Sequence, residues 1–175
     1  MPMNGDVLAG KYRVERVLGR GGMGVVVAAT HLVLGHQVAL KLLHSDGAVD
    51  EEGSARFLRE AKVTARLKSA HVARTLDVGQ LEDGRSFLVM ELLEGHDLGD
   101  ELASRSNLPI GEVVDWVLQA CEGIAEAHAA GIVHRDLKPA NLFLSLDATG
   151  ERVIKVLDFG ISKFAADGAL TSSET

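Results

Sequence analysis

The stretch His134-Arg135-Asp136-Leu137-Lys138-Pro139-Ala140-Asn141 places a carboxylate, an ammonium group and an amide on one loop that a proline stiffens. Seventeen residues after Asn141, the stretch Leu157-Asp158-Phe159-Gly160 adds a second carboxylate directly after an apolar strand. A carboxylate can accept a hydroxyl proton, a lysine can neutralise a phosphoryl group, and Asn and Asp oxygens suit Mg²⁺. The two stretches therefore predict a site for phosphate and a divalent cation. The alternative is a charged surface turn followed by an unrelated Asp-Phe-Gly turn.

A glycine-rich segment, Gly19-Arg20-Gly21-Gly22-Met23-Gly24, interrupts two strand-like runs near the start of the chain. The following Val25-Val26-Val27 is β-branched and predicts a strand rather than a helix. A dinucleotide fingerprint of the Rossmann type requires a helix after its glycines, so that reading is excluded. A glycine hairpin instead lays backbone N–H groups over nucleotide phosphates. An ordinary glycine-rich hairpin remains the alternative.

One lysine, Lys41, lies in the middle of the apolar strand expected at residues 37–43. A lysine in that position either points to solvent or needs a partner, because burying an unpaired ammonium is costly. Residues 51–67 have helical spacing, and Glu60 lies mid-helix beside the apolar stripe. Glu60 is therefore a candidate partner for Lys41, with a solvated surface glutamate as the alternative.

The remaining elements alternate between short strands and helices. Strands are expected at residues 72–79, 86–93, 142–144 and 153–157, and a short helix at about 98–104. A long amphipathic helix is expected at residues 112–130. Its predicted core-facing positions are Val113, Val117, Leu118, Cys121, Ile124, Ala125 and His128.

Composition limits the class of protein. The 175 residues are 46% apolar and 25% charged, with a formal net charge of −7. An acidic balance argues against nucleic acid or an anionic membrane as the main partner. The single cysteine, Cys121, is expected to be a buried small hydrophobe, and no disulfide framework can form. No apolar run long enough to span a membrane and no export leader are present in the sequence.

Taken together, the motifs resemble those of eukaryotic-type serine/threonine protein kinases of the bacterial kind: GxGxxGxV from Gly19, VALK ending at Lys41, HRDLKPAN and DFG. The resemblance implies an α+β, two-lobed fold. Its N-lobe is a five-stranded antiparallel sheet with one helix, and its helical C-lobe is incomplete. The expected domains are a lead-in at residues 1–10, an N-lobe and hinge at 11–93, and a partial C-lobe at 94–175.

The resemblance also implies roles for individual residues. The catalytic residues are Asp136, which orients the acceptor hydroxyl, Lys138, and the pair Lys41 and Glu60. Asn141 and Asp158 are the expected ligands of Mg²⁺, with Mn²⁺ as an alternative ion. The expected ATP-binding residues are Leu18, Gly19, Gly21, Gly22, Gly24, Val26, Ala39, Lys41, Met90, Glu91, Leu93, Asp97 and Phe143. Structural core roles for Met90 and Leu93 fit the same fold.

The implied activity is transfer of the γ-phosphoryl group of Mg-ATP to Ser or Thr in protein substrates, in the cytoplasm or on the cytoplasmic side of a membrane. The alternative function is a nucleotide-binding module without transferase activity. The tail with Thr171, Ser172, Ser173 and Thr175 is either a phosphorylated activation segment or plain disorder. Because further helices of a kinase C-lobe do not follow, the helix at 112–130 is expected to expose an apolar face, which would favour self-association.

Overall fold

The computed structural model describes residues 2–21, 24–43, 51–147 and 149–159, and the side chains of residues 51–56 and 60 lie outside this description. The described residues fall into two compact units. Unit 1 contains residues 2–65 and 75–92, and unit 2 contains residues 66–74 and 93–159. The chain therefore enters unit 2 briefly after its first helix, returns to unit 1, and leaves it again near residue 93.

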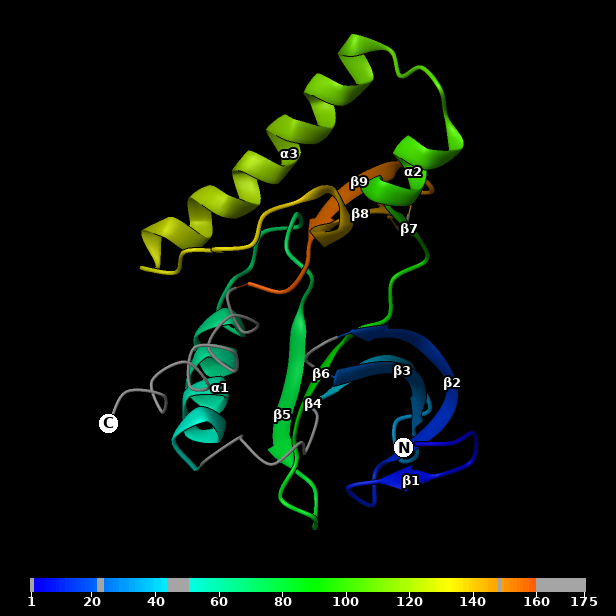
Figure 1. Cartoon of the computed structure of the whole chain (residues 1–175), viewed down its shortest axis with the longest axis vertical. Coiled ribbons are helices and arrows are strands. Elements are labelled where there is room, and N and C mark those ends of the chain that lie inside the picture. The colour runs from blue at the N-terminus through cyan, green and yellow to red at the C-terminus, as the bar shows by residue number, and fades with distance from the viewer. Residues whose placement is uncertain (1, 22–23, 44–50, 148, 160–175) are drawn as a thin grey trace, which may run out of the picture. The chain divides into compact units, whose positions relative to one another are not determined.

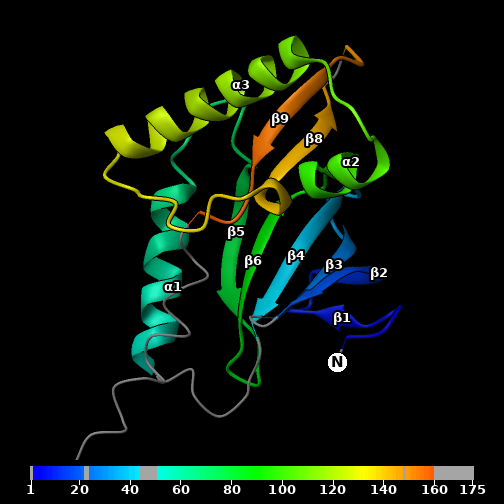
Figure 2. The ribbon, with the colours of Figure 1, turned by 45° about the horizontal axis from the view of Figure 1, so that its top comes forward.

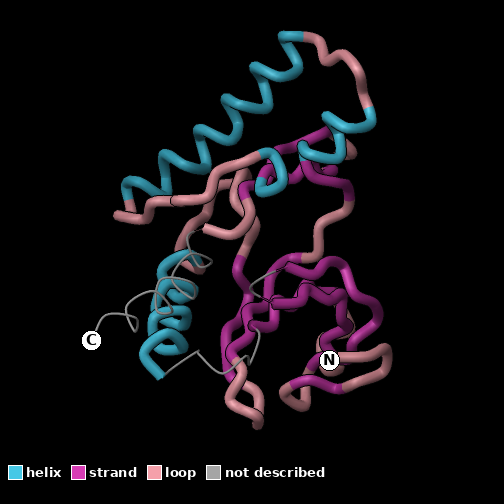
Figure 3. The backbone as a smooth tube through the Cα atoms, in the orientation of Figure 1, coloured by secondary structure: helices cyan, strands magenta, loops and turns pink. Residues whose placement is uncertain are grey.

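Unit 1 is a curled antiparallel sheet with one helix, α1 (Glu51–Thr64), beside strands β5 and β6 (Figures 1 and 3). The strand order is β1-β2-β3-β4-β6-β5. The sheet thus has one strand more than the five predicted. The strands are β1 (Val7–Leu8), β2 (Tyr12–Gly21), β3 (Gly24–His31), β4 (Gln37–Leu43), β5 (Thr75–Gln80) and β6 (Ser86–Glu91).

The additional strand, β1, lies in the predicted lead-in and pairs with β2 through a tight turn. Ala9 and Gly10 both have left-handed backbone angles, with φ of 50° and 63°. The N–H of Lys11 donates to the carbonyl of Leu8 at 3.0 Å, which closes the turn. Two left-handed central residues define a type I′ turn, whose twist matches that of paired strands. The left-handed backbone of Ala9 and Gly10 therefore allows β1 to pair with β2.

The core of unit 1 occupies one face of the sheet. Val25 and Val27 of β3, Leu40 and Leu42 of β4, and Val89 of β6 alternate along their strands and are all buried. Strand residues alternate between the two faces, so this set leaves the intervening residues on the opposite face. The register of the sheet therefore separates the face of this core cluster from the face that carries Ala39 and Lys41.

The segment between α1 and β5, residues 66–74, is held by unit 2. The helix ends at Thr64, whose hydroxyl bonds the carbonyl of Ala61 at 3.0 Å. Farther on, Val72 forms a parallel bridge with Val156, and the N–H of Ala73 donates to the Val156 carbonyl at 3.0 Å. These bonds occupy residues 72–73, so β5 begins at Thr75 rather than at residue 72 as predicted.

Unit 2 combines a small antiparallel sheet with helices. The sheet order is β7-β8-β9, and α3 packs against β9 (Figure 2). A 3-10 turn, η1 (Pro139–Asn141), leads directly into β8. The other elements are β7 (Gly95–Asp97), α2 (Leu98–Ser104), α3 (Ile110–Ala129), β8 (Leu142–Leu146) and β9 (Arg152–Val156).

The face of α3 that packs against the rest of unit 2 is not the face predicted from its large apolar residues. The buried positions are Trp116, Ala120, Gly123 and Ala127, and Ile124 packs against the same core. The predicted core positions Val113, Val117, Leu118, Cys121, Ala125 and His128 are exposed. The small residues let the helix approach its neighbours closely, whereas the larger side chains face outward. The expectation that α3 exposes an apolar face is confirmed. None of the described helices is long and apolar enough to cross a bilayer.

Candidate active site

The glycine loop is the hairpin between β2 and β3. Gly21 pairs with Gly24 at its end, and a register shift lies between Val17 and Gly19. A Cβ at Gly24 would lie 1.9 Å from the carbonyl oxygen of Leu42, so only glycine lets β3 pass that close to β4. A Cβ at Gly19 or at Gly21 would meet no atom within 4 Å, so these glycines border open space. Gly22, the remaining glycine of the prediction, lies outside the described residues.

The register of the sheet brings four predicted nucleotide-binding residues onto one face. Val26 lies opposite Lys41, and Ala39 lies opposite Met90. Ala39 and Lys41 are two residues apart on β4 and so share that face. Val26 is half-buried, and Ala39 is buried without belonging to the core cluster on the other face. One face of the sheet in unit 1 therefore carries the apolar side chains of Val26, Ala39 and Met90 beside Lys41.

Lys41 is 6% exposed, which excludes the solvent-facing alternative. Its buried ammonium is stable as a charged group only with polar or acidic partners. The predicted partner Glu60 belongs to α1, but its side chain lies outside the described residues. The pairing of Lys41 with Glu60 therefore stays a prediction.

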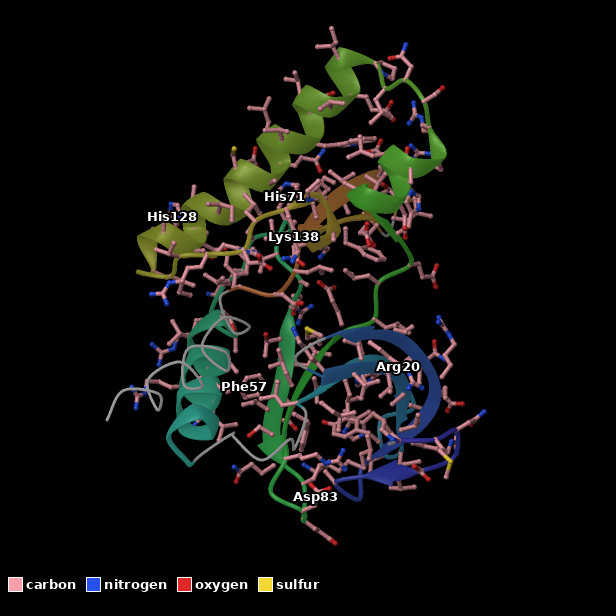
Figure 4. All side chains as sticks on the ribbon, in the orientation of Figure 1. Arg20, Phe57, His71, Asp83, His128 and Lys138 are labelled. Atoms are coloured by element: carbon pink, nitrogen blue, oxygen red, sulfur yellow. The ribbon has the colours of Figure 1, made fainter. Side chains whose placement is uncertain are left out.

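The catalytic loop gathers three of the predicted residues. The Nζ of Lys138 lies 2.8 Å from Oδ2 of Asp136. Asn141 donates its Nδ2 amide to the main-chain oxygen of Asp136 at 2.7 Å and to Oδ2 at 3.2 Å. These bonds hold the Asp136 carboxylate between a cation and an amide. Figure 4 labels Lys138 on the loop that precedes η1, and its side chain is about half exposed.

The main chain of Leu157 ties this loop to the segment that carries Asp158. The N–H of Leu157 donates to the Asn141 carbonyl at 2.9 Å, and the Leu157 carbonyl accepts from Nε2 of His134 at 2.7 Å. Both bonds lie immediately before Asp158, which has a left-handed φ of 53°. Non-glycine residues rarely adopt this conformation, and such strain gathers at functional sites. Arg135, the other strained residue of the site, has a φ of 63°.

His134 contacts the backbone of two residues of this loop region, Asp136 and Leu157, and it was not among the predicted site residues. It is buried, and its ring lies 5.0 Å from that of Phe159, measured between centroids. The N–H of Asp136 approaches its Nδ1 at 3.3 Å while Nε2 faces the Leu157 carbonyl. Both bonds form together only in the tautomer that carries its proton on Nε2. The signal available in the sequence was its place two residues before Asp136.

The remaining predicted nucleotide residues divide between the two units. In unit 2, Asp97 ends β7 and pairs with Phe143 of β8. Its Oδ1 accepts the N–H of Asp100 at 3.0 Å, so this carboxylate also caps α2. Glu91 is the last residue of β6 in unit 1, and Leu93 is the first residue after β6 that belongs to unit 2. Leu18 lies on β2, 38% exposed.

The donor set in unit 2 fits a hard cation that also binds phosphate. Within the described ranges, no group of three or more His, Cys, Asp or Glu side chains could hold a metal ion. Mg²⁺ commonly uses only one or two carboxylates and completes its shell with waters and phosphate oxygens. Because the Nδ2 of Asn141 bonds Asp136, its Oδ1 is the amide atom that could bind a cation. Asn141 and Asp158 thus fit a phosphate-bound Mg²⁺ better than a fully proteinaceous metal cage.

The fold and these residues match one family. A model described as protein kinase domain matches residues 12–175, and the chain belongs to the protein kinase family. It is 44% identical over 159 residues to serine/threonine-protein kinase pkn3 of Myxococcus xanthus, covering 91% of this chain and 29% of that protein. It is 40% identical over 172 residues to serine/threonine-protein kinase PknA of Mycobacterium tuberculosis, covering 96% of this chain and 39% of that protein.

Solved structures show the same fold. The crystal structure of the Mycobacterium tuberculosis PknI kinase domain matches with a TM-score of 0.80 and 34% identity, covering 95% of this chain and 69% of that one. A single-residue variant of the same domain gives a TM-score of 0.80 and 35% identity, with 93% and 64% covered. The predicted two-lobed kinase fold is confirmed, and the sheet of unit 1 has one strand more than expected.

Proposed function

We propose that the protein transfers the γ-phosphoryl group of Mg-ATP to Ser or Thr hydroxyls of protein substrates. The observation that carries this proposal is the Asp136 carboxylate, which has Lys138 and Asn141 each within 3.2 Å, with Leu157 tying Asp158 to the same loop. Phosphoryl transfer depends mainly on positioning and on electrostatic stabilisation, and this loop supplies both.

Each residue then has a distinct task. Asp136 orients the acceptor hydroxyl and accepts its proton, and Lys138 neutralises charge on the transferred group. Asn141 and Asp158 would hold the metal, which draws electron density from the phosphate oxygens when it is bound. In unit 1, Lys41 would bind the nucleotide phosphates, and the Gly19–Gly24 hairpin would cover them with backbone N–H groups.

The experiment compares two alanine variants with a matched control. Asp158→Ala is expected to weaken Mg-ATP binding strongly, because it removes a metal ligand. Asp136→Ala is expected to bind Mg-ATP normally and to lose about 10²-fold or more in turnover, the typical contribution of a positioned acid or base. Asp83→Ala makes the same exchange in an exposed turn, and it should retain both properties. Binding is measured by calorimetry and turnover with Ser- and Thr-containing peptides.

The outcomes separate the alternatives. If the parent binds Mg-ATP but transfers no phosphate to any acceptor, the nucleotide-binding module without transferase activity is the better description. If both variants bind and turn over like the parent, the site assignment is wrong. The full-length protein is the right material, since the chain spans 20–39% of the curated relatives it matches.

The metal, the partners and the location of the protein are inferred from the same proposed activity. We assign Mg²⁺ as the metal, with Mn²⁺ as the alternative, because oxygen ligands and phosphate suit both hard cations. The negative net charge supports protein substrates rather than nucleic acid as partners. Use of ATP supports a cytoplasmic location or one on the cytoplasmic side of a membrane. The exposed apolar face of α3 supports self-association.

A further inference from the structure

Unit 2 contains a cluster of alternating charges that the proposed chemistry does not use. We call it the α2 charge cluster, and its members are His96, Glu101, Arg105, Glu112 and Arg152. They come from β7, α2, the C-cap of α2, α3 and β9, respectively. Among the residues whose burial the structure describes, Glu101 is the one buried carboxylate, at 4% exposure.

Both oxygens of Glu101 are bound. Arg105 donates from Nη1 to Oε1 at 2.8 Å, and Nε2 of His96 contacts Oε2 at 2.5 Å. Arg105 also binds both oxygens of Glu112, at 3.1 and 2.9 Å. A hydrogen bond from Arg105 and, to a smaller extent, one from His96 lower the pKa of Glu101, which is therefore a carboxylate at neutral pH.

Such a cluster orients its elements more than it adds stability. Removing two charges from water offsets much of their attraction, so a buried ion pair is weak evidence for a stability role. A two-oxygen bond to a planar guanidinium, in contrast, restricts both distance and angle. The Arg105–Glu112 pair therefore fixes the C-terminal end of α2 against α3, and the bond from His96 fixes the middle of α2 against β7.

The N-terminal end of α2 carries Asp97, one of the predicted ATP-binding residues. We assign the ribose of the nucleotide to Asp97, because the resemblance to protein kinases implies that role at its position. Its carboxylate also caps this helix. A Cβ built on Gly99 would lie 2.9 Å from Oδ1 of Asp97 and 3.9 Å from the N atom of Ala140, so the first turn of α2 lies against η1. Because the capping bond joins Asp97 to the helix, a shift of α2 moves the Asp97 carboxylate with it.

We infer that Glu101 is a positioning residue that holds α2, and through it the Asp97 carboxylate, in the orientation that binds the nucleotide ribose. This inference rests on the proposed ATP-binding function. Its observable consequence is specific to the sugar. Loss of Glu101 should weaken the contacts to the ribose hydroxyls and leave the contacts to base and phosphates intact.

The test measures Kd for Mg-ATP and for the magnesium complex of 2′,3′-dideoxy-ATP in the full-length protein. In the parent, hydroxyl bonds to a carboxylate should make the ratio of dideoxy-ATP Kd to ATP Kd about tenfold or more. In Glu101→Gln, which preserves side-chain size and removes the charge, the ratio is expected to fall toward one. Asp100→Asn removes one negative charge from the exposed side of the same helix turn, and it should retain the parental ratio.

A second variant, Glu112→Gln, tests the inference even if Glu101→Gln does not fold. Glu112→Gln leaves Glu101 paired with Arg105 and His96, and it should lower the ratio in the same direction by a smaller factor. Equal weakening of both nucleotides in Glu101→Gln would show a general structural role and overturn the inference, as would a parental ratio in that variant. A parent that binds Mg-ATP with a ratio near one would overturn it too, because no ribose contact would exist. A parent that binds no Mg-ATP would instead refute the proposed function itself.

Discussion

Replacing Gly123 by alanine is expected to destabilise the protein even though alanine is the better helix former. A Cβ at this position would lie 2.7 Å from the carbonyl oxygen of His71 and 3.2 Å from Cγ2 of Val72. The oxygen cannot move away cheaply, because it accepts the N–H of Val156 at 2.9 Å. Overpacking lowers the free energy of unfolding by about 1–3 kcal/mol, whereas the higher helix propensity of alanine raises it by about 1 kcal/mol. The expected net loss is about 1 kcal/mol, with about 2 kcal/mol as the upper end.

The assay is thermal unfolding followed by circular dichroism, with Gly111→Ala as the matched control. Gly111 lies in the first turn of the same helix, where a Cβ meets no atom within 4 Å, so that variant should gain up to about 1 kcal/mol. A loss of about 1 kcal/mol lowers Tm by about 2–8 °C, depending on domain size. If Gly123→Ala melts at or above the temperature of Gly111→Ala, α3 does not pack closely on residues 71–72. Figure 4 labels His71 near α3 and His128 at its last turn.

Two further predictions concern a titrating side chain and a pair of backbone bonds. Tyr12 is the only tyrosine, and burial, followed by its hydrogen bond to Asp77, raises its pKa from 10.0 to about 12. A raised pKa adds stability that is complete below about pH 10 and is lost as pH rises through about 12. Tyrosinate absorbance should therefore titrate near pH 12 in the parent and between 10 and 12 in Asp77→Asn; a parental midpoint at 10 would contradict the burial. Glu126→Ala removes the acceptor of the N–H groups of residues 68 and 69, bonded at 2.8 and 2.6 Å, and should cost about 1–3 kcal/mol in urea unfolding. Glu122→Ala removes a carboxylate that is 71% exposed and should cost about 0–1 kcal/mol, so equal midpoints for the two variants would disprove the anchoring role of Glu126.

The residues around the catalytic loop could be predicted because their chemistry is local in sequence. Asp136, Lys138 and Asn141 lie within six positions of one another, so any loop that brings them together also sets their spacing. The strand register of unit 1 was not predicted, because residues 25–29 and 38–43 are apolar almost throughout and do not alternate. The structure supplies that register, and with it the burial of Lys41 and the shared face of Val26, Ala39 and Met90. The functional roles of these residues stay predictions.

The orientation of α3 could not be predicted from its composition, because the helix is apolar on two sides. Hydrophobic periodicity favours the side with the larger residues, such as Val117 and Leu118, and it predicts a buried Cys121 on that side. The structure buries Trp116 with the small residues Ala120 and Ala127 instead. Small side chains bury little area, yet they allow close packing against β9. Which side is covered depends on tertiary partners that hydrophobic periodicity alone does not identify.

The path of residues 66–74 was missed for a related reason. Helical spacing continues to Leu67, so the sequence indicates a longer α1. The helix is interrupted because the next backbone groups bind elsewhere, to the Glu126 carboxylate and to Val156. These partners lie far along the chain, and no local pattern indicates them. The α2 charge cluster was missed in the same way, since Arg152 reaches Glu112 from a distant strand at 3.4 Å.

The attachment of residues 66–74 to unit 2 also has a consequence for how the protein folds as it is synthesised. The carboxylate of Glu126 that binds the N–H of Lys68 is 58 positions farther along the chain. At typical elongation rates, a ribosome needs about 3–12 seconds to add those residues. During that interval Val72 has neither α3 nor β9 to pack against. The strands of unit 1 up to β6 can pair while residues 66–74 are still exposed to solvent. These residues gain all of their native partners only after β9 has left the ribosome.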